Sequence, residues 1–157
     1  MEASQSVPEL VAAAQADVKP YEDHIAANLT AVADGETRAA IAALEAASVD
    51  IFSLFEARMQ HHFKRGPFSR KLKALLLEAG EGDLADRIHQ YYLAINVLKH
   101  GKGASHRELL KTPSALFVVR ASDEDQGASL VDISAPGFFA GLTQTILDAH
   151  SFLEARV

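Results

Sequence analysis

The chain has 157 residues, no cysteine, and 21 acidic against 15 basic residues, which gives a formal charge of −6. This length suits one domain with a sizeable buried core, and the missing cysteines exclude disulfides, thiolate metal sites and cysteine nucleophiles. An acidic chain repels nucleic acid and anionic lipid, so a role with either requires that its positive side chains gather in one place.

The amino terminus reads MEASQSVPEL, with acidic residues and a proline where a secretory signal requires a basic start and an apolar run. No uninterrupted apolar run in the chain reaches the length of about 18 residues that marks a membrane-spanning helix. We therefore expect a cytoplasmic protein with no membrane span.

The first part of the chain predicts two helical segments. Ser6 marks the start of the first, which should run to about Val18 and has a proline in its first turn. Lys19-Pro20 should interrupt it, because proline disfavours the helical conformation of the residue before it. A second segment then continues to about Val32 and ends at the Asp34-Gly35 turn.

The middle of the chain predicts three more helices. Neither proline nor glycine interrupts residues 36–65, whose apolar side chains recur at helical steps, so this should be the longest helix. Gly66-Pro67 ends it, and an amphipathic helix follows and closes at Gly80. Residues 82–100 predict a further helix with a packing seam at steps of four and three residues, formed by Leu84, Ile88, Tyr91, Ile95 and Leu98.

The period changes after residue 113. ALFVVRA (115–121) and SLVDIS (129–134) are short and rich in β-branched and aromatic residues, which predicts an antiparallel hairpin. The loop between them carries Asp123, Glu124 and Asp125, but it lacks the repeated Asp or Asn ligands of a calcium loop. Pro136-Gly137 then opens a last helix with an apolar stripe at Phe139, Leu142, Ile146, Ala149 and Leu153.

These elements predict a mainly α protein. We expect a bundle of four to six helices with one small antiparallel β-hairpin near residues 115–134. Residues 1–157 should form a single helical domain, with the hairpin inserted before the carboxyl-terminal helix.

One line of side chains on the predicted helix 82–100 does not belong to its packing seam. His89, Leu93, Asn96 and His100 fall within about 60° of arc, and the seam points about 140° away. The line includes an apolar residue, so we expect it to be covered by a second helix, a partner subunit or a ligand.

INVLKHGKGASHRELL, residues 95–110, contains the densest group of candidate functional residues. One interpretation is structural, with His100 near the last carbonyls of a helix and Gly101 as its cap. The other is an anion site, in which Ser105 and Glu108 form a capping box at a helix amino terminus. A phosphate there would be contacted by Lys99, Lys102, His106 and Arg107.

Asn96-Val97-Leu98-Lys99-His100-Gly101 resembles the signature of the HEPN superfamily, in which Arg-Asn is followed after a few residues by His-Gly. The resemblance implies a small helical domain that forms a homodimer. Many such domains are metal-independent ribonucleases of toxin–antitoxin and phage-defence systems, and others are inactive. Carried over to this chain, it assigns catalysis to His100 and an orienting role to Asn96.

The arginine of that signature is absent. Leu93, Ala94 and Ile95 stand five to seven positions before His100, where the arginine belongs. Without this cation the site lacks the charge that stabilises a phosphoryl transition state, unless Lys99 or Arg107 supplies it instead. We therefore expect a non-catalytic relative that binds RNA, a nucleotide phosphate or a protein partner through a dimer cleft.

Two alternatives to this function remain open. The first is a metal-independent endoribonuclease that uses His100, and the second is a purely structural dimerisation module. A second basic region would extend an RNA site if it lay beside the first. Its residues are Lys64, Arg65, Arg70, Lys71 and Lys73.

We expect neither a metal nor a cofactor. Asp86 and His89 make a single acid-x-x-His pair, whereas a di-iron bundle needs two such pairs and additional glutamates. A zinc site would have to recruit histidines from separate helices, namely His24, His61, His62 and His150.

Overall fold

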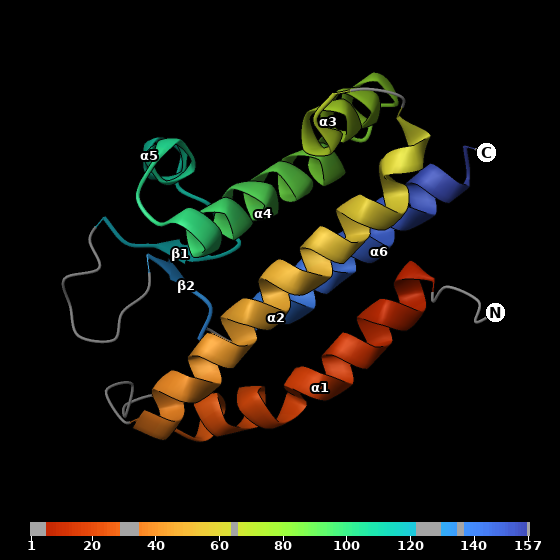
Figure 1. Ribbon diagram of the computed structural model, residues 1–157. Helices are drawn as coiled ribbons and strands as arrows, with labels where there is room; N and C mark the ends of the chain where they lie inside the picture. Colours follow the sequence, from red (N-terminus) through yellow and green to blue (C-terminus); the bar gives the residue numbers. More distant parts are fainter. Residues whose placement is uncertain (1–5, 29–34, 64–65, 122–129, 135–136, 157) are drawn as a thin grey trace.

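The protein is described by a computed structural model that places residues 6–28, 35–63, 66–121, 130–134 and 137–156 (Figure 1). The described residues form a helical bundle with one two-stranded antiparallel sheet, which confirms the predicted fold class. The elements are α1 (Val7–Ala27), α2 (Gly35–Met59), the 3-10 turn η1 (Gln60–His62), α3 (Phe68–Glu78), α4 (Gly82–His100), α5 (Ala104–Lys111), β1 (Val118–Val119), β2 (Val131–Asp132) and α6 (Phe138–Glu154).

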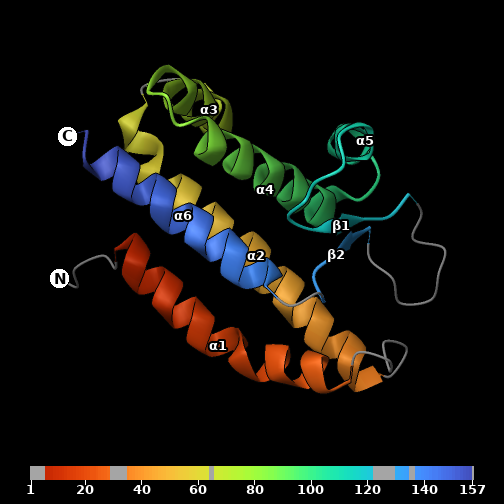
Figure 2. The same cartoon turned by 180° about the vertical axis from the view of Figure 1, so that it is seen from behind.

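Helices α2 and α6 occupy the middle of the bundle. Both pack against α1 on one side and against α4 on the other (Figures 1 and 2). Helices α3 and α5 pack on α4 from outside, so α4 is covered on both sides. None of the helices within the described ranges combines the length and apolar character that a membrane crossing requires.

The hairpin is joined to the bundle by aromatic side chains. Val118 pairs with Asp132 and Val119 with Val131, which fixes the antiparallel register. Tyr91, Phe117 and Phe138 bring together α4, the segment before β1, and α6, and their ring centroids lie 5.7 to 5.8 Å apart. Such aromatic contacts add to the stabilisation that comes from burying the rings.

Helix α4 packs closely on α6 at Gly141. A Cβ atom at this position would overlap the hydroxyl of Tyr91, which is 2% exposed. Gly141 is therefore required by the packing of α4 on α6 rather than by backbone conformation.

The predicted break at Lys19-Pro20 is wrong, because α1 runs through Pro20 to Ala27. The helix bends along its length (Figures 1 and 2), as expected where proline removes a backbone hydrogen bond. Val7, Val11, Val18 and Ile25 are buried on both sides of the proline, so packing offsets the interruption. The predicted end of the second segment at Val32 lies outside the described residues, as does Asp34 of the predicted turn.

The longest helix is also shorter than predicted, since α2 ends at Met59 rather than at residue 65. Its last turn tightens into η1, where the Phe63 amide donates to the carbonyl of Gln60 at 2.9 Å. Phe63 leaves in an extended conformation and packs its ring 5.6 Å from that of Phe68. Residues 64–65 and the hairpin loop at 122–129, including its carboxylates, lie outside the described ranges.

Candidate functional site

Helix α5 covers His89, Leu93 and Asn96 of the line that the sequence predicted on α4, while His100 at its end stays exposed. His89 Nε2 donates to Glu108 Oε2 at 2.7 Å, and Asn96 Nδ2 donates to Ser105 Oγ at 3.2 Å. Leu93 lies buried between these two polar contacts. Of the three covers that we expected, a second helix of the same chain fills the position.

His100 lies at the end of α4 and is exposed, as is Lys99 before it. Gly101 has a φ of +73°, a conformation that favours glycine, and its amide donates to the carbonyl of Val97 at 2.7 Å. The structural interpretation of this stretch, a helix end closed by glycine, is therefore confirmed. The same geometry leaves His100 at the surface, one turn beyond Asn96.

The predicted capping box is wrong. Helix α5 begins at Ala104 with Gly103 as its cap residue, and no side chain bonds to its first amides. Ser105 lies inside the helix and accepts from Asn96, while Glu108 accepts from His89. Both side chains face α4 and bond to it, so they are not available to cap the first amides of α5.

His106 does not lie at the surface, which corrects its predicted contact with a phosphate. Its side chain is 3% exposed, and Nε2 lies 2.7 Å from the carbonyl of Arg120. A carbonyl can only accept, so this nitrogen carries the proton and donates. His106 fastens α5 to the residue that follows β1, and it shares the buried face of α5 with Leu109.

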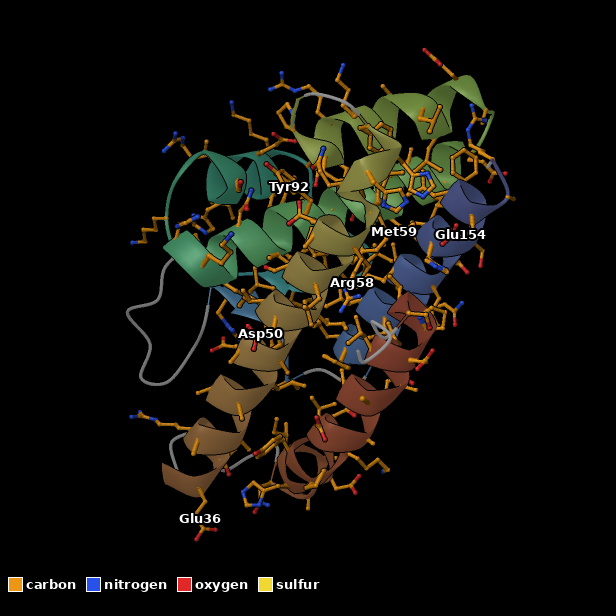
Figure 3. All side chains as sticks on the ribbon, turned by 45° about the vertical axis from the view of Figure 1, so that its right-hand side comes forward. Glu36, Asp50, Arg58, Met59, Tyr92 and Glu154 are labelled. Carbon is orange, nitrogen blue, oxygen red and sulfur yellow. The ribbon has the colours of Figure 1, made fainter. Side chains whose placement is uncertain are left out.

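Two adjoining hollows lie over α4 between α3 and α5, with volumes of about 420 and 410 Å³. They share Lys73, His89, Leu93 and Glu108, so we treat them as one feature, the α3–α5 groove. The complete lining of the larger hollow is Pro67, Ser69, Arg70, Lys73, His89, Tyr92, Leu93, Ala104, Ser105 and Glu108. Figure 3 labels Tyr92 between the ribbons of α3 and α5.

The floor of the groove is aromatic and one wall is cationic. The rings of His89 and Tyr92 are nearly parallel, with 22° between their planes and 6.4 Å between their centroids. Arg70 and Lys73 come from α3 on one side. Two acids also line the groove: Glu108 of α5 pairs with His89, and Asp86 of α4 accepts a hydrogen bond from Gln90. Flat rings beside positive charge suit a ligand that combines a planar ring with an anionic group.

Glu56 lies beneath the amino end of α3 and is in reach of Lys99. Burial raises the pKa of Glu56, whereas a hydrogen bond from Ser69 Oγ at 3.3 Å and the charge of Lys99 lower it. This electrostatic contact brings the carboxyl end of α4 close to the amino end of α3. Glu56 therefore forms a polar contact between α2 and α3.

The fold brings together two stretches of the chain that lack acidic residues. Neither the stretch from 57 to 77 nor the stretch from 87 to 107 contains Asp or Glu, and together they hold ten of the 15 Lys and Arg residues. The first stretch includes most of α3 and the second includes most of α4 and the start of α5. The groove lies where these helices meet, an adjacency that the sequence left open.

Not every cation of these stretches points toward the groove. Arg87 Nη1 instead donates to Thr145 at 3.2 Å and to Asp148 at 3.1 Å, so it joins α4 to α6. Four more basic residues lie near the junction of α4 and α5. Lys99 and His100 end α4, Lys102 lies in the loop between two glycines, and Arg107 belongs to α5. We define the basic face as Arg70, Lys73, Lys99, His100, Lys102 and Arg107.

Sequence reasoning missed several lining residues, above all Tyr92 and the His89–Glu108 pair. Tyr92 stands next to the seam residue Tyr91 and so lies about 100° from it around α4, at the partly buried edge of the core, and this offset was the available signal. The partner of His89 could not be read from the sequence, because it comes from another helix. In the described part of the chain, no group of three or more His, Asp or Glu side chains is arranged to hold a metal ion.

Comparison of the chain with protein-family models, with curated proteins and with solved structures finds no match.

Proposed function

We propose that this protein is a non-catalytic relative of the HEPN domains that binds RNA or a nucleotide phosphate on the basic face. The observation that carries the proposal is the meeting of two acid-free stretches at the α3–α5 groove. In a chain with a net charge of −6, a local excess of positive charge overcomes the general repulsion of phosphate.

The groove supplies a second kind of contact for such a ligand. Tyr92 and His89 offer ring faces on which an unpaired base can stack, and stacking tolerates any base. Arg70 and Lys73 stand on the adjacent wall, where the phosphates of a stacked nucleotide would run. We therefore favour single-stranded RNA over a duplex, whose bases are not available for stacking.

Three features argue against strong nuclease activity. The positions that carry the arginine in HEPN nucleases are Leu93, Ala94 and Ile95, and all three are buried, with at most 6% exposure. The amide of Asn96 is engaged by Ser105. His100 thus lacks the arginine that would hold a scissile phosphate in a HEPN nuclease.

The proposal includes a homodimer in the cytoplasm, as the resemblance implies. Light scattering on the purified protein should give twice the mass of 16.9 kDa. A monomer at the concentrations used for RNA binding would remove the dimer cleft from the proposal and leave the single-chain basic face.

A second candidate function is a protein-interaction or dimerisation module without an RNA role. It is favoured by the apolar side chains around β1, where Leu110, Leu116 and Val118 are 39%, 37% and 54% exposed. These lie beside a hollow of about 240 Å³ next to Pro113 and Phe117.

RNA binding measured by fluorescence anisotropy in EDTA tests the proposal. Arg70→Glu should weaken binding by at least about tenfold, and the affinity should fall steeply from about 50 to about 200 mM salt. Arg38→Glu makes the same charge change near the amino end of α2, whereas α3 contacts α2 near its carboxyl end. It is therefore the matched control, with little expected effect.

Cleavage is followed in the same samples with His100→Ala alongside. Cleavage that disappears in His100→Ala would replace the non-catalytic proposal with the ribonuclease alternative. The absence of binding, or equal loss in both charge variants, would favour the protein-interaction module.

A further inference from the structure

Three histidines and a glutamate meet where the carboxyl end of α2 reaches α6. His61 and His62 belong to η1, with ring centroids 4.3 Å apart. On α6, His150 Nε2 lies 3.2 Å from Glu154 Oε1, and the charges of both residues act on His62. Figure 3 labels Met59, the last residue of α2, and Glu154 at this place, which we call the histidine corner.

His62 has an unusual environment within this corner. Its Nε2 atom is buried and has no hydrogen-bond partner, which is true of no other side-chain nitrogen or oxygen in the described residues. A neutral imidazole can leave one nitrogen unbonded at modest cost, whereas an imidazolium has two N–H donors and a charge to satisfy. His62 as a whole is partly buried, so the structure disfavours the charged form through this one nitrogen.

The neighbouring groups do not compensate a charge on His62. His61 Nδ1 is already bonded to the carbonyl of Arg58 at 2.9 Å, and the charges of His61 and His150 both oppose a charge on His62. Glu154 is the one group that favours the charged form, but half of its side chain is exposed and it already pairs with His150. Burial, followed by the charge of His61, lowers the pKa of His62 from its ordinary value of 6.5.

We propose that the histidine corner is a pH-sensitive latch that holds η1 against the last turns of α6 at neutral pH and releases it in mild acid. In the released form His62 is hydrated and takes a proton more readily, so acid favours release. The sign follows from the lowered pKa. Above pH 6.5 neutral His62 contributes its full stabilisation to the latched form. This stabilisation is lost as the pH falls through the lower pKa that His62 has in the latched form. This inference does not depend on the proposed function.

Hydrogen–deuterium exchange of the full chain tests the latch. Between about pH 7.5 and about pH 5.5, after correction for the intrinsic pH dependence of exchange, protection of residues 59–63 and 149–154 should fall about tenfold. Protection of the middle of α4 should not change. An equal loss in both regions would show global destabilisation and overturn the proposal.

His62→Phe should remove the local pH dependence, because phenylalanine fills similar space and cannot titrate. His24→Gln is the matched control, since His24 lies on α1 and contacts Thr37 at 3.2 Å, away from the corner. A tenfold loss of protection that persists in His62→Phe would contradict the latch.

An NMR titration of the wild-type protein keeps the proposal testable if His62→Phe does not fold. The His62 ring signal should titrate below pH 6.5, and the amides of η1 should change over the same pH range. A titration of His62 that leaves the η1 amides unchanged would overturn the latch.

Discussion

Helices α1 and α3 cover opposite sides of the bundle (Figure 1). Each buries an apolar face, yet their charged residues are mostly of opposite sign. Helix α1 has four acidic residues and one lysine, and Lys19 Nζ lies 2.7 Å from Asp23. Helix α3 has three basic residues before its single glutamate at position 78.

This difference is not required for folding. Exposed positions of an amphipathic helix accept either sign of charge with little effect on stability. The separation of charge into an acidic α1 side and a basic α3 side therefore points to a partner that distinguishes them. A polyanion that binds on the α3 side and is repelled by the α1 side fits both observations.

The largest effect should come from breaking the core that both sides share. Gly141→Ala places a methyl group against the Tyr91 hydroxyl, and it should lower the free energy of unfolding by about 1 to 3 kcal/mol despite the higher helix propensity of alanine. Urea denaturation measures this. Gly82→Ala, where nothing lies within 4 Å of an added Cβ, is the control and should stay within about 0.5 kcal/mol of wild type.

Reversing charge on the two sides tests the comparison itself. Arg70→Glu with Lys73→Glu should reduce RNA affinity by at least about tenfold, while stability changes by less than about 0.5 kcal/mol. Asp17→Lys on the exposed side of α1 should change affinity by no more than about twofold. Equal responses on the two sides would mean that only net charge matters.

The His89–Glu108 pair should contribute a smaller amount, because both side chains are partly exposed. Glu108→Gln keeps a hydrogen-bond acceptor and should lower stability by no more than about 0.5 kcal/mol in thermal unfolding. His89→Ala should in addition weaken RNA binding, since it removes half of the aromatic floor. Unchanged RNA affinity in His89→Ala would exclude the floor of the groove from the binding surface.

The smallest effect concerns the buried acid beside the basic face. Burial raises the pKa of Glu56, so its ionisation opposes folding as the pH rises through that higher value. Glu56→Gln should therefore be slightly more stable than wild type at neutral pH, by a few tenths of a kcal/mol after allowance for solvent screening. The advantage should vanish below pH 4.5, and an advantage that persists there would contradict this assignment.

Helix positions and the hairpin were predictable because they depend on local periodicity. The step of three and four residues identified the buried face of α4, and the change of pattern after residue 113 located β1 and β2. Pro20 misled the prediction because the burial of Val18 and Ile25 outweighs the loss of one backbone hydrogen bond. The end of α2 was missed because Phe63 leaves the helix to pack on Phe68.

The candidate site was predictable only in part. The sequence identified the Asn96 and His100 line and the need for a cover, but it could not say that α5 is the cover or that Ser105 would face Asn96. His106 was misassigned because the sequence does not reveal that Arg120 offers it a carbonyl from the hairpin. Groups that meet across helices depend on tertiary packing, which local patterns do not encode.

The most direct test of the central claim is to map where RNA binds. Amide chemical shifts of the isotope-labelled protein should be recorded while a short single-stranded RNA is added in EDTA at low salt. We expect the changes in amide chemical shift to concentrate on Arg70, Lys73, Tyr92, Lys102 and their neighbours, and the amides of α1 to be unaffected. Shifts centred on α1, or none at RNA concentrations that saturate other single-strand binders, would contradict it.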